Sequence, residues 1–212
     1  MDWKQIPLGP LQTNCYVLFN ENKEAVIFDP GGHGDILNTW LIDNNLRPQA
    51  VLLTHAHFDH IGAVEDVRQK WNIPVYLHET ENDWLTDPEK NGSSRFLGGA
   101  AIKAEPADVF ITKESELQVG SFHFSLFHTP GHSPGSVSFY HKETGTVFSG
   151  DVLFENGIGR ADLPGGDYET LIKSINDFLM PLPEDTAVAC GHGNVTTIGN
   201  EMTSNPFLHG FS

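Results

Sequence analysis

The feature that most restricts the fold is a series of short β-rich runs separated by glycine, proline and aspartate. Runs of β-branched and aromatic residues bounded by such turn formers are typical of strands. We therefore predict a protein in which strands dominate. The clearest runs are YVLF (16–19), AVIF (25–28), AVLLT (50–54), PVYL (74–77), FHFSLFHT (122–129), SVSFY (136–140), TVFSG (146–150) and AVAC (187–190).

Helical segments occur singly between these strands. Apolar residues recur at helical spacing in 34–43, 59–71 and 168–180. In the first segment, Ile36 and Leu37 belong to the face predicted to be buried. Two stacked sheets with helices outside them would bury all of these faces. We therefore predict an α/β protein with two mixed sheets flanked by helices.

Residues 79–118 are less regular than the rest of the chain. NGSS (91–94) and LGGA (97–100) predict loops, and we interpret the segment as a flap over a site. No low-complexity tract or linker divides the sequence, and 212 residues suit one ordinary domain. A single domain over residues 1–212 is expected.

Acidic residues outnumber basic ones by 28 to 12, which gives a formal net charge of −16. Because nucleic acids and anionic membranes are bound by lysine and arginine patches, we expect neither as a partner. No apolar run approaches the about 20 residues of a membrane span. Residues 1–19 do not resemble a signal peptide. Cys15 and Cys190 are too few for a disulfide framework, so a soluble cytoplasmic protein is expected.

The heptad THAHFDH (54–60) concentrates three of the 11 histidines beside an aspartate. It joins a predicted strand to a predicted helix. His55 and His57 are two residues apart, so their side chains project to the same side of an extended chain. Asp59 and His60 follow at the turn and can point to a neighbouring position. Two ligand pairs from one loop suit a two-metal centre, and imidazole with carboxylate suits zinc, iron or manganese.

Three further ligand candidates each follow a predicted strand, in a loop that contains glycine. They are His132 in TPGHSPGS, Asp151 in FSGD and His192 in ACGHG. Glycine beside each candidate allows tight turns near a crowded site. We assign one metal to a first set of ligands, a second metal to another set, and one shared carboxylate to both. The sets are His55, His57 and His132; Asp59, His60 and His192; and the bridging Asp151.

The other histidines lack such partners and are interpreted as structural. Cys190 precedes His192 by two residues but falls within a predicted strand. We interpret it as a small buried hydrophobe and not as a thiolate ligand. The histidines interpreted as structural are His33, His78, His123, His128, His141 and His209.

Taken in order, THAHFDH, TPGHSPGS, SGD and CGHG resemble the signature of the metallo-β-lactamase superfamily, which is HxHxDH followed by separate His, Asp and His ligands. With the opening strands and FDPGG (28–32) included, the resemblance covers essentially the whole chain. It implies an αβ/βα sandwich of two mixed sheets flanked by helices. It also implies two divalent metal ions at one edge, with zinc preferred and iron or manganese open.

Within this superfamily, the chain most resembles the hydroxyacylglutathione hydrolases, or glyoxalase II group. The similar segments are TPGHSPGSVSFY, SGDVLFENGIGRADLPGGDYETLIKSI, LPEDT and CGHG. Only 20 residues follow His192, so the resemblance is to the compact bacterial members without a C-terminal helical domain. Asp151 weakens the resemblance to antibiotic-hydrolysing members, which usually lack the bridging aspartate. Arg160 matches a glutathione-binding basic residue, but Asp162 replaces the aromatic residue expected there.

This resemblance implies a metal-dependent thioesterase with a small-molecule substrate such as S-lactoylglutathione. A metal-bridging hydroxide would attack the thioester carbonyl, and Asp59 would serve as the catalytic residue that orients it. Arg160 would bind a substrate carboxylate or, alternatively, pair with Asp162 or Asp167, while Asp29 would fix the loop beneath the metals. The alternatives are a persulfide dioxygenase with mononuclear iron, a lactone or β-lactam hydrolase, and a non-catalytic metal-binding module.

Overall fold

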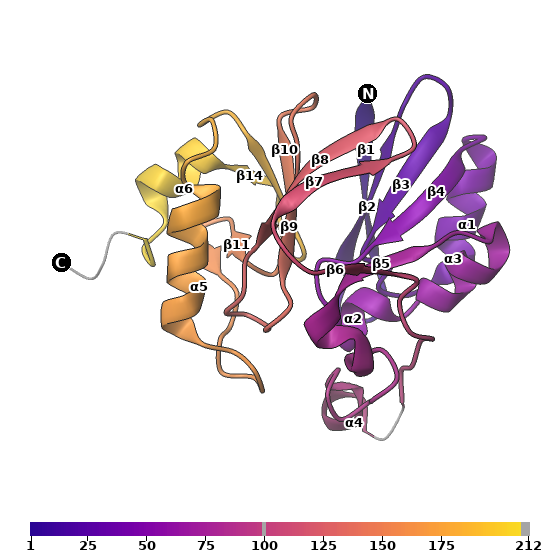
Figure 1. The fold of residues 1–212 in the computed structure, drawn as a ribbon, viewed down its shortest axis with the longest axis horizontal. Helices are drawn as coiled ribbons and strands as arrows, with labels where there is room; N and C mark the ends of the chain where they lie inside the picture. Colours follow the sequence, from indigo (N-terminus) through magenta and orange to yellow (C-terminus); the bar gives the residue numbers. More distant parts are fainter. Residues whose placement is uncertain (99–100, 209–212) are drawn as a thin grey trace. The chain divides into compact units, whose positions relative to one another are not determined.

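The computed structural model describes residues 1–98 and 101–208, which form two compact units (Figure 1). The first unit contains residues 1–112 and 118–122, and the second contains the remaining described residues. The LGGA motif predicted as a loop lies partly outside the described residues.

The first unit is built on a mixed six-stranded sheet whose strands are ordered as they occur along the chain. The first three strands pair antiparallel, and the third to the sixth pair parallel. Parallel neighbours require long crossover connections. These connections bring helices to the sheet, together with residues 54–60, which carry four predicted ligands and are called the ligand loop below. The strands are β1 (Asp2–Leu8), β2 (Thr13–Phe19), β3 (Glu24–Phe28), β4 (Arg47–Leu52), β5 (Val75–His78) and β6 (Val109–Ile111).

Helices α1 (Gly34–Asp43) and α3 (Val64–Trp71) lie beside each other on the first sheet (Figure 1). They bury Leu37 and Val67, among others, in a core shared with the strands. Burial of such apolar side chains is the main term that holds helices on a sheet. Three shorter helices complete this unit: α2 (Phe58–Ile61), the 3₁₀ helix η1 (Glu79–Trp84) and α4 (Ser93–Phe96).

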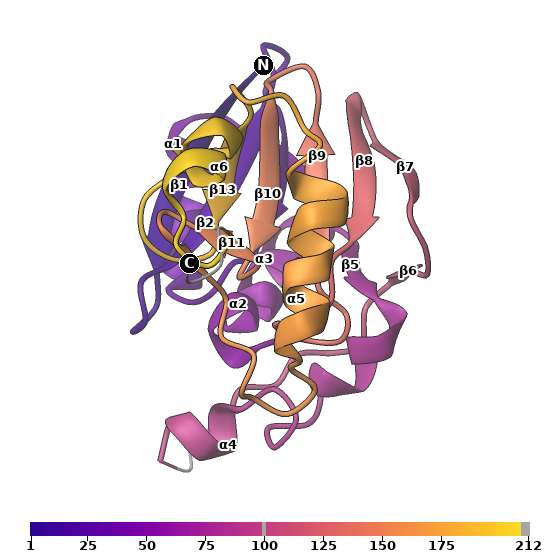
Figure 2. The same ribbon diagram turned by 90° about the vertical axis from the view of Figure 1, so that its left-hand side faces the viewer.

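The second unit contains most of the other mixed six-stranded sheet, in which β10 (Thr146–Gly150) and β13 (Ala187–Cys190) pair parallel. Helix α5 lies along one face of this sheet (Figure 2), and its Leu171 shares a core with Val147 and Val188 of the strands. In sheet order, the strands are β14 (Thr196–Thr197), β13 (Ala187–Cys190), β10 (Thr146–Gly150), β9 (Val137–His141), β8 (Phe122–His128) and β7 (Ser115–Val119). The other elements are hairpin β11 (Leu153–Phe154) and β12 (Gly157–Ile158), α5 (Tyr168–Ser174), the π-helical η2 (Ile175–Leu179) and α6 (Ile198–Ser204).

All of the predicted strands are present, and the prediction of mixed sheets with flanking helices is confirmed. Strand β1 was not predicted because its sequence, DWKQIPL, mixes charged, polar and apolar residues. It lies at the edge of the sheet, where Pro7 is tolerated and only half of the strand needs burial. Strands β6 and β7 are also edge strands; β6 has only three residues, and β7, SELQV, is mostly polar.

Two details of the helix prediction are wrong. The single helix predicted over 59–71 is divided into α2 and α3, because the Ala63 amide donates to the carbonyl of Pro30 at 2.8 Å instead of to a helical carbonyl. Ile36 is 51% exposed, because the buried face of α1 is defined by Leu37 and Leu41.

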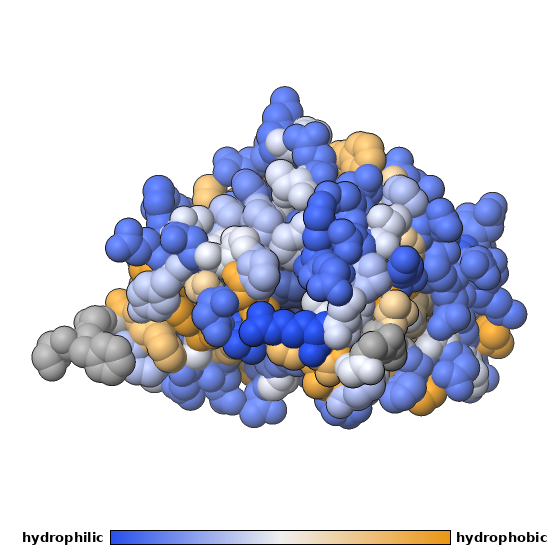
Figure 3. All heavy atoms as spheres, turned by 90° about the horizontal axis from the view of Figure 1, so that it is seen from below, coloured by the Kyte–Doolittle hydropathy of each residue, from blue (hydrophilic) through white to orange (hydrophobic). Residues whose placement is uncertain are grey.

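Hydrophilic side chains cover most of the face shown in Figure 3, with smaller hydrophobic areas between them. This distribution agrees with the large excess of acidic residues in the sequence. Among the described residues, no helix is both long and apolar enough to cross a membrane.

Candidate metal centre

The first unit provides four of the predicted ligands from one connection. His55 and His57 lie in the irregular stretch between β4 and α2, and His57 is the N-cap residue of α2. Asp59 and His60 lie in α2 itself. The three histidines are buried, whereas the Asp59 carboxylate is partly accessible.

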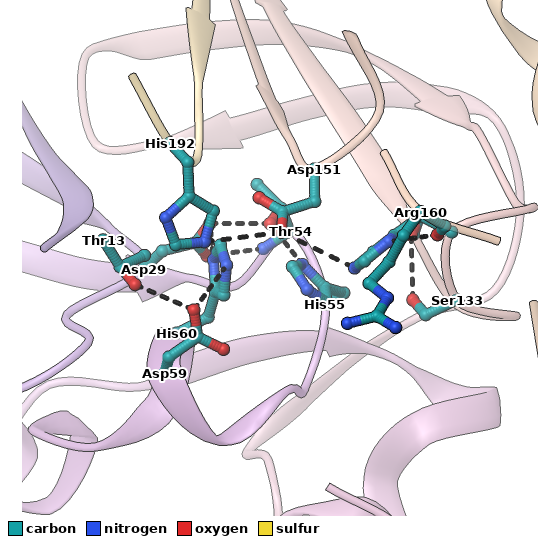
Figure 4. Close-up of polar contacts among 12 residues, drawn as sticks. Thr13, Asp29, Thr54, His55, Asp59, His60, Ser133, Asp151, Arg160 and His192 are labelled. Carbon is teal, nitrogen blue, oxygen red and sulfur yellow. Dashed lines mark hydrogen bonds and ion pairs between the residues drawn. The ribbon is translucent and has the colours of Figure 1, made fainter. Parts of the chain in front are cut away.

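Asp29 and Thr54 orient two of these histidines (Figure 4). The Asp29 carboxylate accepts from the Thr54 amide at 2.8 Å, the Thr54 hydroxyl at 2.6 Å and Nδ1 of His60 at 3.0 Å. Because Thr54 gives its only hydroxyl proton to Asp29, its oxygen accepts from Nδ1 of His55 at 3.0 Å. Both imidazoles therefore carry the proton on Nδ1 and present the Nε2 lone pair, as metal-binding histidines do.

The carboxylate of Asp59 is held by Thr13, the first residue of β2. The Thr13 hydroxyl donates to Oδ2 of Asp59 at 2.9 Å, and the same oxygen lies 3.6 Å from Nε2 of His60. A Cβ atom at Gly31 would lie 1.9 Å from the carbonyl oxygen of Asp59, so only glycine allows this approach. The FDPGG motif therefore supports the ligand loop, as expected for Asp29.

The three remaining predicted ligands converge within the second unit. Oδ2 of Asp151 lies 3.6 Å from Nε2 of His132 and 3.5 Å from Nε2 of His192. Nδ1 of His132 lies 2.8 Å from the carbonyl oxygen of Arg160, and because a carbonyl only accepts, His132 is protonated on Nδ1. One carboxylate oxygen thus faces the Nε2 atoms of two imidazoles.

These separations fit ligands of a metal better than hydrogen bonds. Two ligands at about 2.1 Å from a tetrahedral ion lie about 3.4 Å from each other. The distances from Asp59 to His60, from Asp151 to His132 and from Asp151 to His192 are 3.6, 3.6 and 3.5 Å. Imidazole and carboxylate are suitable donors for zinc, iron and manganese. The residues of each unit therefore fit the divalent cations that the sequence predicted.

After hairpin β11–β12, the chain passes close to the predicted ligands Asp151 and His132. A Cβ atom at Gly159 would lie 1.8 Å from the carbonyl oxygen of Asp151 and 3.2 Å from Cβ of His132. Glycine at this position therefore allows the next residue, Arg160, to place its carbonyl on His132.

The Arg160 side chain makes a bidentate ion pair with Asp162. Nε donates at 2.7 Å and Nη2 donates at 2.8 Å, and both side chains are mostly exposed. The hydrogen bond with Asp162 raises the pKa of Arg160 further above its usual range. Of the two roles predicted for Arg160, the structure shows the pairing with Asp162.

Cys190 has a larger role than that of a small buried hydrophobe. Its thiol lies 3.1 Å from the carbonyl oxygen of His192 and 3.2 Å from that of Asn194, in donor geometry to both. Burial, reinforced by the charge of Asp151, raises the pKa of Cys190 to about 12. The thiol stays protonated near neutral pH, so Cys190 organises the loop that carries His192.

Several contacts of the ligand loop involve residues that the sequence interpretation did not select. They come from Thr13, Thr54 and the η1 residues Glu81 and Trp84. Thr54 could have been suspected because it precedes His55 directly, but the others lie too far away in sequence to be recognised.

Four histidines interpreted as structural form hydrogen bonds with residues that are not ligand candidates. His209 lies outside the described residues, and His123 is exposed on β8. The hydrogen-bonded residues and their partners are His33 with Gly9, His78 with Thr80, His128 with Pro134 and His141 with Thr144.

The chain belongs to the metallo-β-lactamase superfamily, whose fold and ligand motif its sequence resembles. The model of the metallo-β-lactamase superfamily matches residues 8–192, which include every predicted ligand. The sequence resemblance to this superfamily is therefore confirmed, and the chain is a metallo-hydrolase.

Two curated relatives match along essentially their full lengths. The chain is 52% identical over 212 residues to the probable metallo-hydrolase YqgX of Bacillus subtilis (strain 168), with 100% of both chains covered. It is 40% identical over 210 residues to hydroxyacylglutathione hydrolase GloC of Haemophilus influenzae, with 99% of both chains covered.

Two solved structures share the fold closely. One is described as BLEG-1 B3 metallo-beta-lactamase; it is 60% identical, has a TM-score of 0.97 and covers 99% of this chain and 100% of its own. The other is TTHA1623 in a di-iron-bound form, which is 41% identical, has a TM-score of 0.86 and covers 97% of this chain and 100% of its own. The predicted fold class is confirmed by these similarities.

Proposed function

We propose that this protein is a dinuclear metal-dependent thioesterase that hydrolyses S-lactoylglutathione or a closely related thioester. The observation that carries the proposal is the position of Asp151, whose Oδ2 faces Nε2 of both His132 and His192. A carboxylate between two histidines suits a ligand shared by two ions. The 40% identity to hydroxyacylglutathione hydrolase GloC supports the choice of substrate.

The proposal assigns the predicted ligands to two ions. The match of the family model to residues 8–192, which include all of these ligands, supports a joint centre. The di-iron-bound form of TTHA1623 supports two metals and keeps iron open beside zinc. One ion is assigned to His55, His57 and His132, the other to Asp59, His60 and His192, and Asp151 to both.

When bound, such ions would lower the pKa of a water molecule and polarise the thioester carbonyl. Asp59 would orient the attacking water and accept its proton, with Thr13 holding the carboxylate in place. The Nδ1 hydrogen bonds of His55 and His60 would keep both rings in the metal-binding tautomer throughout turnover. A thiol has a pKa of about 8.5, so its thiolate leaves without a strong general acid.

Arg160 is the proposed anchor for a substrate carboxylate. Its carbonyl contacts the predicted ligand His132, so its side chain starts beside that ligand. Asp162 is paired with the guanidinium of Arg160 and would compete with an anionic substrate for it. Replacing Asp162 with Asn should lower KM for S-lactoylglutathione by about threefold, whereas Arg160→Ala should raise KM with little change in kcat. Steady-state kinetics of both variants test this role.

The decisive experiment combines metal analysis with thioester hydrolysis. Protein purified without chelator should contain about two equivalents of metal and hydrolyse S-lactoylglutathione. Removal of the metal should abolish turnover, and zinc, iron or manganese should be compared for restoring it. Less than about one equivalent of metal in active protein would contradict the dinuclear scheme.

Hydrolysis of β-lactams is a second candidate, because the structure with 60% identity is described as a B3 metallo-beta-lactamase. A chromogenic cephalosporin assayed beside S-lactoylglutathione separates the two activities. A kcat/KM that is higher for the cephalosporin would favour the second candidate. Oxygen uptake with glutathione persulfide would instead indicate the dioxygenase alternative.

A further inference from the structure

The backbone of the ligand loop needs hydrogen-bond partners outside the sheet. Residues 55–57 belong to neither a strand nor a helix, and Ala56 is fully buried between His55 and His57. A buried backbone amide without an acceptor is costly, so almost all of them are paired. The Ala56 amide donates to Oε2 of Glu81 at 2.6 Å, and Glu81 is itself fully buried.

The segment that follows Glu81 contacts the next two residues of the loop. The ring of Trp84 lies against the ring of His57, with centroids 5.7 Å apart and planes inclined by 35°. The carbonyl of Asn91 accepts from the Phe58 amide at 3.0 Å. Three successive residues, 56 to 58, are thus held by residues 81 to 91.

Asn91 fixes this segment from within. Its side chain is buried and donates to the carbonyl of Trp84 at 3.0 Å and to that of Ile102 at 2.9 Å. The NGSS motif, predicted as a loop, therefore begins with an anchored residue, and its two serines begin helix α4. Residues 81–91 form a support for the ligand loop.

A buried carboxyl group loses its contact with water, so its hydrogen bonds matter for the structure. Transfer of an ionised carboxylate from water to the interior costs several kcal/mol unless hydrogen bonds offset it. What Glu81 offers at Ala56 is length, because the glutamate side chain spans the gap between η1 and the ligand loop. Aspartate, which is one methylene shorter, would not reach.

We propose that Glu81 is a positioning residue of the metal centre. Its carboxylate fixes the Ala56 amide and thereby sets the direction in which His55 and His57 project. The inference rests on the proposed function in one respect, because it takes these two histidines as metal ligands. It gives residues 81–91 a role as the support of that ligand pair.

Two substitutions separate the effect of side-chain length from that of the carboxyl group. Glu81→Asp keeps the carboxyl group but moves its oxygens away from the Ala56 amide. Glu81→Gln keeps an oxygen at the same distance but has no carboxyl group. The same changes at Glu79, which is exposed on the same helix, provide matched controls. Metal-free proteins are titrated with Co²⁺ and monitored by visible absorption, and their thermal unfolding is measured without metal.

Glu81→Asp should raise the Co²⁺ dissociation constant by about tenfold or more and alter the absorption spectrum, as expected when support of a metal ligand is lost. Glu81→Gln should stay within about threefold of wild type, as should both Glu79 variants. Equal affinity of Glu81→Asp and wild type, or a greater loss in Glu81→Gln than in Glu81→Asp, would overturn the proposal. A lowered unfolding temperature with unchanged Co²⁺ binding would reduce Glu81 to a structural role.

The titration needs no substrate, so it is independent of the thioesterase assignment. Wild-type protein that binds Co²⁺ but does not hydrolyse thioesters would refute the proposed substrate and leave the role of Glu81 standing. Wild-type protein that binds no Co²⁺ would overturn both proposals.

Discussion

The two units supply their predicted metal ligands in different ways. In the first unit, four ligands come from residues 55–60, and other side chains support them through Asp29, Thr54 and Glu81. In the second unit, three predicted ligands come from three separate strand ends, and the carbonyl of Arg160 and the thiol of Cys190 support them. One half of the set is therefore encoded locally, whereas the other is assembled by the topology of a sheet.

This difference decides how each half should respond to substitution. The predicted ligands of the first unit lie on one loop, and a few buried polar side chains hold that loop in place. Those of the second unit lie at strand ends, so their positions depend on the whole sheet and on the carboxylate of Asp151, which both histidines face. Substitutions of ligands should therefore have the largest effects in the second unit, and substitutions of supporting side chains should have larger effects in the first.

The largest effect is expected at Asp151. Asp151→Ala removes the oxygen that both His132 and His192 face, so turnover should fall by about 10³-fold or more while the protein stays folded. Kinetics, metal content and circular dichroism test this. Asp177→Ala, which changes an exposed acid of the same unit, should have no effect. Full activity of Asp151→Ala would refute the ligand assignment.

The next effect is expected at Asp29 in the first unit. Asp29→Ala leaves the Thr54 amide, the Thr54 hydroxyl and Nδ1 of His60 without their buried acceptor. Metal affinity should fall by 10- to 100-fold, roughly, and the free energy of unfolding by about 2–4 kcal/mol. Co²⁺ titration and denaturant unfolding measure both, with Asp43→Ala on the exposed end of α1 as control. Unchanged Co²⁺ affinity would show that the first half does not need this support.

A smaller effect is expected for Cys190, the corresponding support in the second unit. Cys190→Ala removes a donor to the carbonyls of His192 and Asn194, so metal affinity should fall by about fivefold. Cys190→Ser keeps a donor and should recover most of the loss. If Ser and Ala behave alike in the Co²⁺ titration, the thiol acts only by filling space.

The smallest effect is expected at His141, which is not a ligand candidate. Burial, only partly opposed by the charge of Glu143, lowers the pKa of His141 below its usual value. The unfolded chain therefore binds this proton more readily, so the free energy of unfolding should decrease as pH falls below about 6.5. His141→Gln should flatten this dependence between pH 7 and 5 without changing Co²⁺ affinity. Equal pH dependence in wild type and His141→Gln would contradict the expectation.

The limits of sequence-based prediction follow the same division. The heptad can be recognised because four ligands share one short motif, and the strands that carry the other ligands have clear apolar patterns. The fold class was predictable for that reason. Supporting contacts were not, since Glu81 is separated from Ala56 by 25 residues and Arg160 from His132 by 28. The grouping of all seven ligands around two ions stays a prediction.

Both aspartates that the proposal gives to the metals rest against a glycine from a distant segment. The carbonyl of Asp59 occupies the space of a side chain at Gly31, and that of Asp151 occupies the space of a side chain at Gly159. Any larger residue at either glycine would therefore push on one of these aspartates, although neither glycine carries a functional group. Two positions without chemistry of their own thus limit how this sequence can vary.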